Sequence, residues 1–116
     1  HFARFDFHIC YDSSFIWRGR PFVVRVRAVN PTAPTTPVTK LPSTGSLCVT
    51  TRHLKSGTME EFYASTHAES GEHVINVTFH SQGVYECMAQ FNRMDLQDRP
   101  FRVQVGAAAI FESMFQ

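Results

Sequence analysis

The chain has 116 residues and a mass of 13.2 kDa, which is enough for one domain and too little for a second hydrophobic core. Hydrophobic residues make up 43% of it, with 11 Phe among the aromatic ones, so we expect a packed globule rather than a disordered chain. Eleven Lys and Arg against ten Asp and Glu leave a net charge of +1, which excludes the marked basic excess of a general nucleic-acid or membrane-surface binder. No apolar run approaches the roughly 20 residues of a membrane helix.

Five segments alternate apolar and polar residues, and this period of two predicts half-buried β-strands. In chain order they span residues 3–9, 21–30, 73–79, 84–91 and 100–105. Their predicted inward residues are Phe5, Phe7 and Ile9; Phe22, Val24, Val26 and Ala28; Ile75, Val77 and Phe79; Tyr85, Cys87, Ala89 and Phe91; and Phe101, Val103 and Val105.

Two weaker strands complete the pattern. Residues 46–54 and 58–66 alternate less regularly and are separated by Lys55, Ser56 and Gly57, which predicts a hairpin. The short break at 81–83 predicts that the strands on either side of it are neighbours.

About seven short strands, with no convincing helix before Gly106, predict an all-β antiparallel sandwich of immunoglobulin-like type. We expect one such domain over residues 1–106, and a linker or short helix over 107–116. Residues 30–46 contain four of the six Pro residues, which predicts a long extended loop. Because the chain begins at His1 rather than Met, we expect it to be processed or cut from a longer protein.

The residue types that carry chemistry do not form a recognisable site. His73 and His80 would lie about 23 Å apart along an extended strand, too far to share an ion, and no Cys-x-x-Cys pair exists. There is also no Gly-x-Ser-x-Gly motif. We therefore expect no catalytic residues, no metal and no cofactor.

The three cysteines have different predicted surroundings. Cys87 points into the core, where a thiol behaves as a small apolar side chain. Cys10 and Cys48 fall on outward faces, so they are either free thiols or, in an oxidising compartment, the two halves of a bridge.

Arginines form the one local charge cluster, at Arg18, Arg20, Arg25 and Arg27. Residues two apart on a strand lie about 6.6 Å apart on one face, a spacing that suits phosphate or carboxylate groups. Arg25 and Arg27 are therefore candidate anion-binding residues, and the alternative is a solvated strand face with local ion pairs. The outward Asn76 begins an Asn-Val-Thr glycosylation sequon, which keeps an extracellular location open.

The last third of the chain resembles the final two strands of filamin-type immunoglobulin repeats. The resemblance is carried by Gly83, Tyr85, Phe91, Asn92, Leu96, Pro100, Phe101, Val103 and Val105, whereas Arg99 and Cys87 depart from the usual Ser and Val. A Tyr at that place fills the core while its hydroxyl reaches the backbone at the start of the strand.

This resemblance implies a non-enzymatic interaction module of a larger cytoskeletal or scaffolding protein, located in the cytoplasm. Its partner would be a protein or peptide that adds a strand to the third strand of the domain, here 46–54, and lies against the fourth. Carried over, the candidate partner-binding residues are Cys48, Thr50, Arg52 and Phe62. The alternative for this edge is that the Pro-rich loop covers it and prevents aggregation.

Two other resemblances leave alternatives open. Arg18, Gly19, Arg20, Pro21 and Phe22 look like the strand start of transglutaminase N-terminal sandwiches, which would make the chain an accessory domain of an enzyme. The run Gly83, Tyr85 and Cys87 looks like the sixth strand of ordinary immunoglobulin domains, but the partner Cys on the second strand is missing. An extracellular adhesion or receptor domain remains the other reading.

Overall fold

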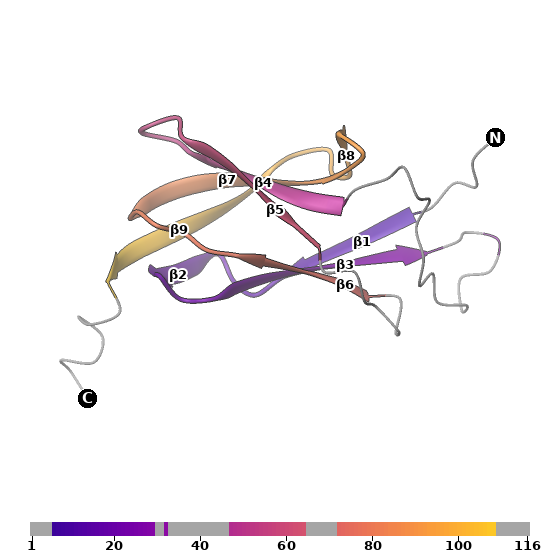
Figure 1. Ribbon diagram of the computed structural model, residues 1–116, viewed down its shortest axis with the longest axis horizontal. Coiled ribbons are helices and arrows are strands. Elements are labelled where there is room, and N and C mark those ends of the chain that lie inside the picture. The colour runs from indigo at the N-terminus through magenta and orange to yellow at the C-terminus, as the bar shows by residue number, and fades with distance from the viewer. Residues whose placement is uncertain (1–5, 30–31, 33–46, 65–71, 109–116) are drawn as a thin grey trace.

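The computed structural model describes residues 6–29, 32, 47–64 and 72–108, and this part of the chain forms nine β-strands and no helix (Figure 1). The strands are β1 (Asp6–Tyr11), β2 (Phe15–Arg18), β3 (Phe22–Val29), β4 (Leu47–His53), β5 (Met59–Tyr63), β6 (Glu72–Val77), β7 (Gly83–Phe91), β8 (Met94–Asp95) and β9 (Phe101–Ala108). All seven predicted strands are present, and β2 and β8 are additional.

The strands form two sheets that stack on one another (Figure 1). The smaller sheet has the order β1-β3-β6 and is antiparallel. The larger has the order β2-β9-β7-β4-β5, and β8 adds to β7. The prediction of an all-β immunoglobulin-like sandwich is therefore confirmed.

The core lies between the sheets and is built from the alternating rows that the sequence shows. On β3 the side chains of Phe22, Val24, Val26 and Ala28 are at most 1% exposed, while Arg27 on the opposite face is exposed. The row of β6 lies beside them in the same sheet, the rows of β7 and β9 face them from the other sheet, and together they form one continuous apolar cluster. Burial of these rows is the main stabilising term of such a sandwich.

The connection from β6 to β7 crosses between the sheets, so the prediction that these two strands are neighbours is wrong. The chain leaves the smaller sheet at Val77 and then inserts Phe79 into the core, edge-on to Phe22 at 5.4 Å between ring centroids. Tyr85 fixes the other end of the crossing, because its hydroxyl donates to the Ser81 carbonyl at 3.0 Å and accepts from the Ser81 N–H at 3.3 Å. The predicted role of the Tyr85 hydroxyl is confirmed.

Strand β2 pairs with β9 in the parallel direction, with a bulge between Trp17 and Arg18. Its four residues are too few, and too apolar on both faces, to show alternation. Phe15 and Trp17 pack over Gly106 of β9, where any β-carbon would approach both rings to about 2.9 Å. Gly106 is therefore required for β2 to close this edge of the sheet.

The predicted hairpin of β4 and β5 is confirmed. The N–H of Gly57 donates to the His53 carbonyl at 2.8 Å, and Gly57 has a φ of +75°, which an L side chain rarely adopts. The N–H of Ser56 donates to Nδ1 of His53 at 3.1 Å, so Nδ1 is an acceptor. The other ring nitrogen, Nε2, then carries the hydrogen and donates to the Gln82 carbonyl at 2.8 Å.

Several predictions lie outside the described residues. These are the inward position of Phe5, the Pro-rich loop at 30–46 apart from Thr32, and the tail at 109–116. Strand β9 itself continues past Gly106, the predicted end of the domain, to Ala108.

Candidate partner-binding surface

The two outer strands of the larger sheet are β2 and β5. Strand β5 pairs with β4 on one side, and no described strand pairs with its other side. It lies next to β6 of the smaller sheet without forming a ladder with it. Within the described part of the chain, β5 thus presents a backbone edge where the two sheets come close together.

Alternation along the β4–β5 ladder determines which backbone groups point to this edge. The N–H of Ala64 donates to the Leu47 carbonyl, and the N–H of His53 donates to the Thr58 carbonyl, both at 2.9 Å. Hydrogen-bonded pairs therefore occur at every second residue of β5, which places Glu60 and Phe62 among those bonded to β4. The N–H and C=O groups of the intervening residues, 59, 61 and 63, point away from β4 toward the open edge.

The same three residues form the outer row of side chains on β5. Met59 is 64% exposed and Tyr63 is 58% exposed, which is unusual for large apolar side chains on a strand. Glu61 lies between them, and one of its carboxylate oxygens accepts a hydrogen bond from the Tyr63 hydroxyl at 3.2 Å. This β5 outer row, Met59, Glu61 and Tyr63, therefore combines two apolar groups with a central carboxylate.

The predicted third strand, β4, is not an edge. It pairs with β5 on one side and with β7 on the other, so the expectation that a partner strand adds directly to 46–54 is wrong for this arrangement. In the ladder, Cys48 lies opposite Tyr63, Thr50 opposite Glu61, and Arg52 opposite Met59. The predicted residues thus form the row one strand inside the edge.

The predicted side chains of β4 differ in how accessible they are. Cys48 was expected to be an outward contact, but its residue is only 3% exposed between the neighbouring strands. Thr50 is half-buried, and its hydroxyl donates to the Met88 carbonyl at 3.4 Å. Arg52 is exposed. Whether Thr50 and Arg52 contact a partner stays a prediction.

The fourth predicted contact, Phe62, faces inward. It lies opposite Val49 and packs against the core cluster from the edge strand. Its ring is half-buried, so it would border the inner side of any added strand rather than the outer row.

Arg52 is one member of a charged triad on the outer face of the larger sheet. It donates to one carboxylate oxygen of Glu86 at 2.7 Å, and Arg102 of β9 donates to the other at 3.2 Å. These interactions, led by the hydrogen bond from Arg52, lower the pKa of Glu86 below its usual value. The triad cross-links β4, β7 and β9 and carries a net charge of one positive unit.

The predicted anion-binding arginines lie on the outer face of the smaller sheet. Arg25 contacts Asp12 at 3.4 Å and Glu72 at 3.7 Å, so two carboxylates already neutralise it. Arg27 is exposed and lies opposite Glu72 in the ladder. Arg18, by contrast, belongs to the larger sheet, which separates it from this pair. Arg25 therefore forms local ion pairs, as the alternative interpretation of the sequence predicts. Anion binding at Arg25 and Arg27 stays a prediction.

All three cysteines are free thiols. Cys87 is 1% exposed, as predicted for a core position, and its burial raises the pKa of the thiol to about 12. Cys10 is exposed on the smaller sheet, whereas Cys48 faces outward from the larger one. Because these two lie on opposite outer faces of the sandwich, this fold does not allow the bridge that the sequence left open.

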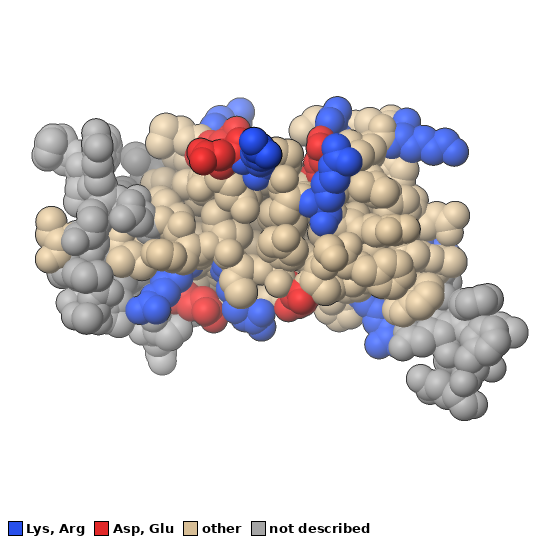
Figure 2. Space-filling model, turned by 180° about the vertical axis from the view of Figure 1, so that it is seen from behind, with Lys and Arg blue, Asp and Glu red and all other residues tan. Residues whose placement is uncertain are grey.

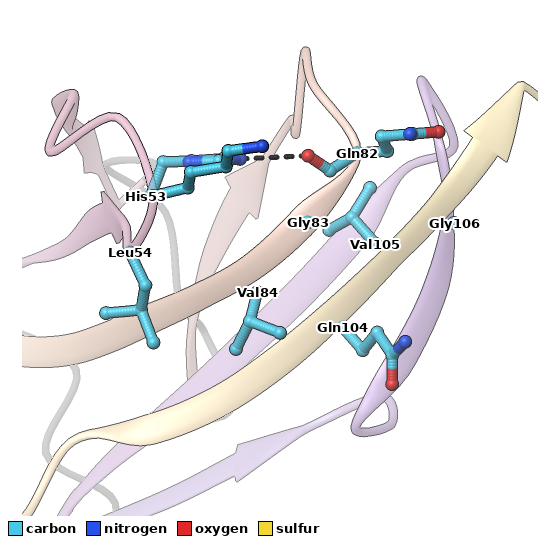
Figure 3. A pocket seen from close by; sticks show the side chains of 9 residues that line it. His53, Leu54, Gln82, Gly83, Val84, Gln104, Val105 and Gly106 are labelled. Carbon is cyan, nitrogen blue, oxygen red and sulfur yellow. Dashed lines mark hydrogen bonds between the residues drawn. The ribbon is translucent and has the colours of Figure 1, made fainter.

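A shallow depression of about 810 Å³ lies where β4 ends and β7 begins (Figure 3). It is lined by His53, Leu54, Lys55, Gln82, Gly83, Val84, Gln104, Val105 and Gly106. The hydrogen bond from His53 to Gln82 spans one side of it, and a β-carbon on Gly83 would lie 2.5 Å from Nε2 of His53. None of the predicted site residues lines this depression.

The surface shows no large area of one charge on the face in Figure 2. Lys and Arg gather there with Asp and Glu in small groups along two margins, and the band between them is uncharged. Among the described residues, no three His, Cys, Asp or Glu side chains are grouped so that they could hold a metal ion. A search of the same residues finds no helix long and apolar enough to cross a membrane.

The true edge strand was the hardest to identify from the sequence. On β5 the inward positions are Glu60 and Phe62, and the outward ones are Met59, Glu61 and Tyr63. Apolar and acidic residues therefore occur on both faces, which hides the period of two. The available signal was that two large apolar residues flank a carboxylate at spacings of two.

Comparison with known proteins identifies the fold. No protein-family model matches the chain, and no curated protein matches its sequence. Among solved structures, it is similar to the crystal structure of the Lin-41 filamin domain, with a TM-score of 0.62 and 16% sequence identity over 86% of this chain and 91% of that one. At this identity the similarity concerns the fold alone. The chain has the filamin-type immunoglobulin-like fold that its last third predicts.

Proposed function

We propose that this domain is a protein-interaction module that captures an extended segment of a partner protein along the open edge of β5. It would act within a larger scaffolding or cytoskeletal protein, in the cytoplasm. The observation that carries the proposal is the direction of the backbone groups of residues 59, 61 and 63, which face away from β4. A partner strand would satisfy those groups and extend the larger sheet by one strand.

The fold supports this proposal in a second way. The β4–β5 turn holds the start of β5 in place. His53, at the end of β4, accepts a hydrogen bond from Ser56 in this turn and donates one to Gln82, just before β7. A preorganised edge loses less conformational entropy when a partner binds. Thr50 and Arg52, one strand inside the edge, would border the bound segment.

The test uses the 116-residue chain and random 12-residue peptides displayed on phage. Selected peptides are synthesised, and backbone amide hydrogen exchange is measured with and without them. We expect the amides of Met59, Glu61 and Tyr63 to gain protection. Those of Glu60 and Phe62 should change little, because they already bond to β4. Protection that is confined to other strands, or no selected peptide at all, would contradict the proposal.

A proline on the edge provides the matched variant. Glu61→Pro removes an N–H that points outward, so it should abolish peptide binding while the β4–β5 ladder remains. Glu61→Ala keeps the N–H and should weaken binding at most about fivefold. Circular dichroism and denaturant unfolding verify that both variants are folded. Equal binding by the Pro variant and the unsubstituted chain would show that no strand is added here.

A further inference from the structure

The carboxylate of Glu61 has no described Lys or Arg within ion-pair distance. Several other acidic groups on the sheets do have cationic partners, since Glu86 contacts Arg52 and Arg102, and Glu72 contacts Arg25. Among the described residues, Glu61 instead accepts a hydrogen bond from the Tyr63 hydroxyl alone. Within the described part of the chain, it therefore presents a carboxylate with no cationic partner at the middle of the open edge.

The negative charge of Glu61 raises the pKa of two neighbouring side chains, Tyr63 and Cys48. It is the largest cause that raises the pKa of Tyr63, and it also contributes to the raised pKa of Cys48. Arg93, in the turn after β7, opposes both effects but does not cancel them. At Tyr63 and Cys48 the charge of Glu61 therefore has a larger effect than that of Arg93.

On the inner side of β5, the other sheet leaves little space for the side chains of a bound strand. Glu60 faces the smaller sheet, and its carboxylate lies 3.8 Å from Nε2 of His80, just beyond the end of β6. Phe62 packs on the core from the same side. Side chains of an added strand that point inward would therefore meet the other sheet, so the outer row decides which segments fit.

We propose that the segment bound by β5 carries a basic residue with an apolar residue two positions before it and another two positions after it. This inference rests on the proposed strand addition at β5. Residues directly opposite one another on adjacent antiparallel strands place their side chains on the same face, about 5 Å apart at Cβ. The basic residue would lie opposite Glu61, and the apolar residues would lie opposite Met59 and Tyr63.

The apolar positions gain from the exposed surface of Met59 and Tyr63, which an added strand would cover. The basic position gains from a carboxylate that Tyr63 already orients, so little further ordering is needed. A Lys or Arg there would neutralise the edge, whereas an acidic residue would meet Glu61 directly.

The experiment compares two synthetic peptides that differ only at the central position, Lys or Glu, with Val two positions away on each side and Thr elsewhere. Dissociation constants are measured by titration with the 116-residue chain and with its Glu61→Lys variant. The unsubstituted chain should bind the Lys peptide about 2- to 10-fold more tightly than the Glu peptide. The variant should reverse this order, and salt should reduce the difference in both cases.

The outcomes separate this inference from the function on which it rests. If both peptides bind equally, with protection at the amides of residues 59, 61 and 63, strand addition stands and the charge preference is refuted. If neither peptide binds, and library peptides give no protection on β5, strand addition itself fails. A reversed order in the Glu61→Lys variant excludes a merely structural role for Glu61, because loss of folding would weaken both peptides alike.

Discussion

Tyr85 and His53 show how single polar groups organise the apolar core. The two rings meet edge-on at 4.8 Å, and Tyr85 in turn contacts Phe79 at 4.7 Å between centroids. Each polar atom at this junction has a partner, because the Tyr85 hydroxyl bonds to Ser81 and both nitrogens of His53 are used. The result is a continuous aromatic path from the β4–β5 turn to the crossing between the sheets.

The hydroxyl of Tyr85 should therefore stabilise the fold measurably. Replacing Tyr85 by Phe leaves the ring in place but leaves the N–H and C=O of Ser81 without this partner. Because Ser81 is exposed and water can reach these groups, we expect the free energy of unfolding to fall by about 0.5–1.5 kcal/mol, the usual net contribution of a hydrogen bond. Denaturant unfolding followed by circular dichroism measures it.

Tyr63→Phe is the matched control for that measurement. Its hydroxyl bonds to Glu61 at the exposed edge, so its loss should change stability by no more than about 0.5 kcal/mol. An equal effect of the two variants would show that the bonds of Tyr85 to Ser81 add nothing specific.

At the scale of elements, the triad of Arg52, Glu86 and Arg102 joins three strands across the outer face of the larger sheet. The ladder places Glu86 directly opposite both arginines, Arg52 on one side and Arg102 on the other. Both carboxylate oxygens are used, which holds the three strands in register independently of the core.

This triad predicts a specific dependence of stability on pH. The pKa of Glu86 is lower in the folded than in the unfolded chain, so its contribution is complete above the unfolded-state pKa and is lost as the pH falls through the folded-state value. The difference in the free energy of unfolding between the unsubstituted chain and Glu86→Gln should therefore be largest near neutral pH and shrink toward acid. Denaturant unfolding at a series of pH values measures it, and a difference that grows on acidification would contradict the assignment.

The elements also show how far the sequence could predict the fold. The rows on β3, β6, β7 and β9 follow from strict alternation, since each strand has one face in the core and one in solvent. Strand β2 could not be predicted, because its pairing depends on Gly106, some ninety residues later in the chain. The edge was assigned to β4 rather than β5 because alternation reveals the faces of a strand but says nothing about its neighbours in the sheet.

For individual site residues too, properties set by one strand could be predicted, and properties set by neighbouring strands could not. The burial of Cys87 and the hydroxyl contact of Tyr85 follow from their positions in one strand, and both are confirmed. Cys48 is predicted to face outward, but its burial depends on the strands that flank β4. Alternation within β4 does not reveal these neighbours. The separation of Arg18 from Arg25 likewise requires knowledge of which sheet contains β2.

For the whole molecule, one core shared by both sheets predicts a single unfolding transition. The only Trp in the sequence, Trp17, lies on β2 at the margin of the larger sheet, whereas circular dichroism reports on all strands. We expect the two signals to give coincident denaturant curves, as a two-state domain requires. Loss of the Trp17 signal at lower denaturant than the dichroism would show that β2 detaches separately.

The parallel pairing of β2 with β9 also has a mechanical consequence. In Figure 1 the described chain begins with β1 at one end of the molecule and finishes with β9 at the other, and β2 and β9 run in the same direction. A force that pulls the two ends apart therefore slides these strands along each other instead of peeling them open. Hydrogen bonds loaded in this way must rupture together rather than one at a time.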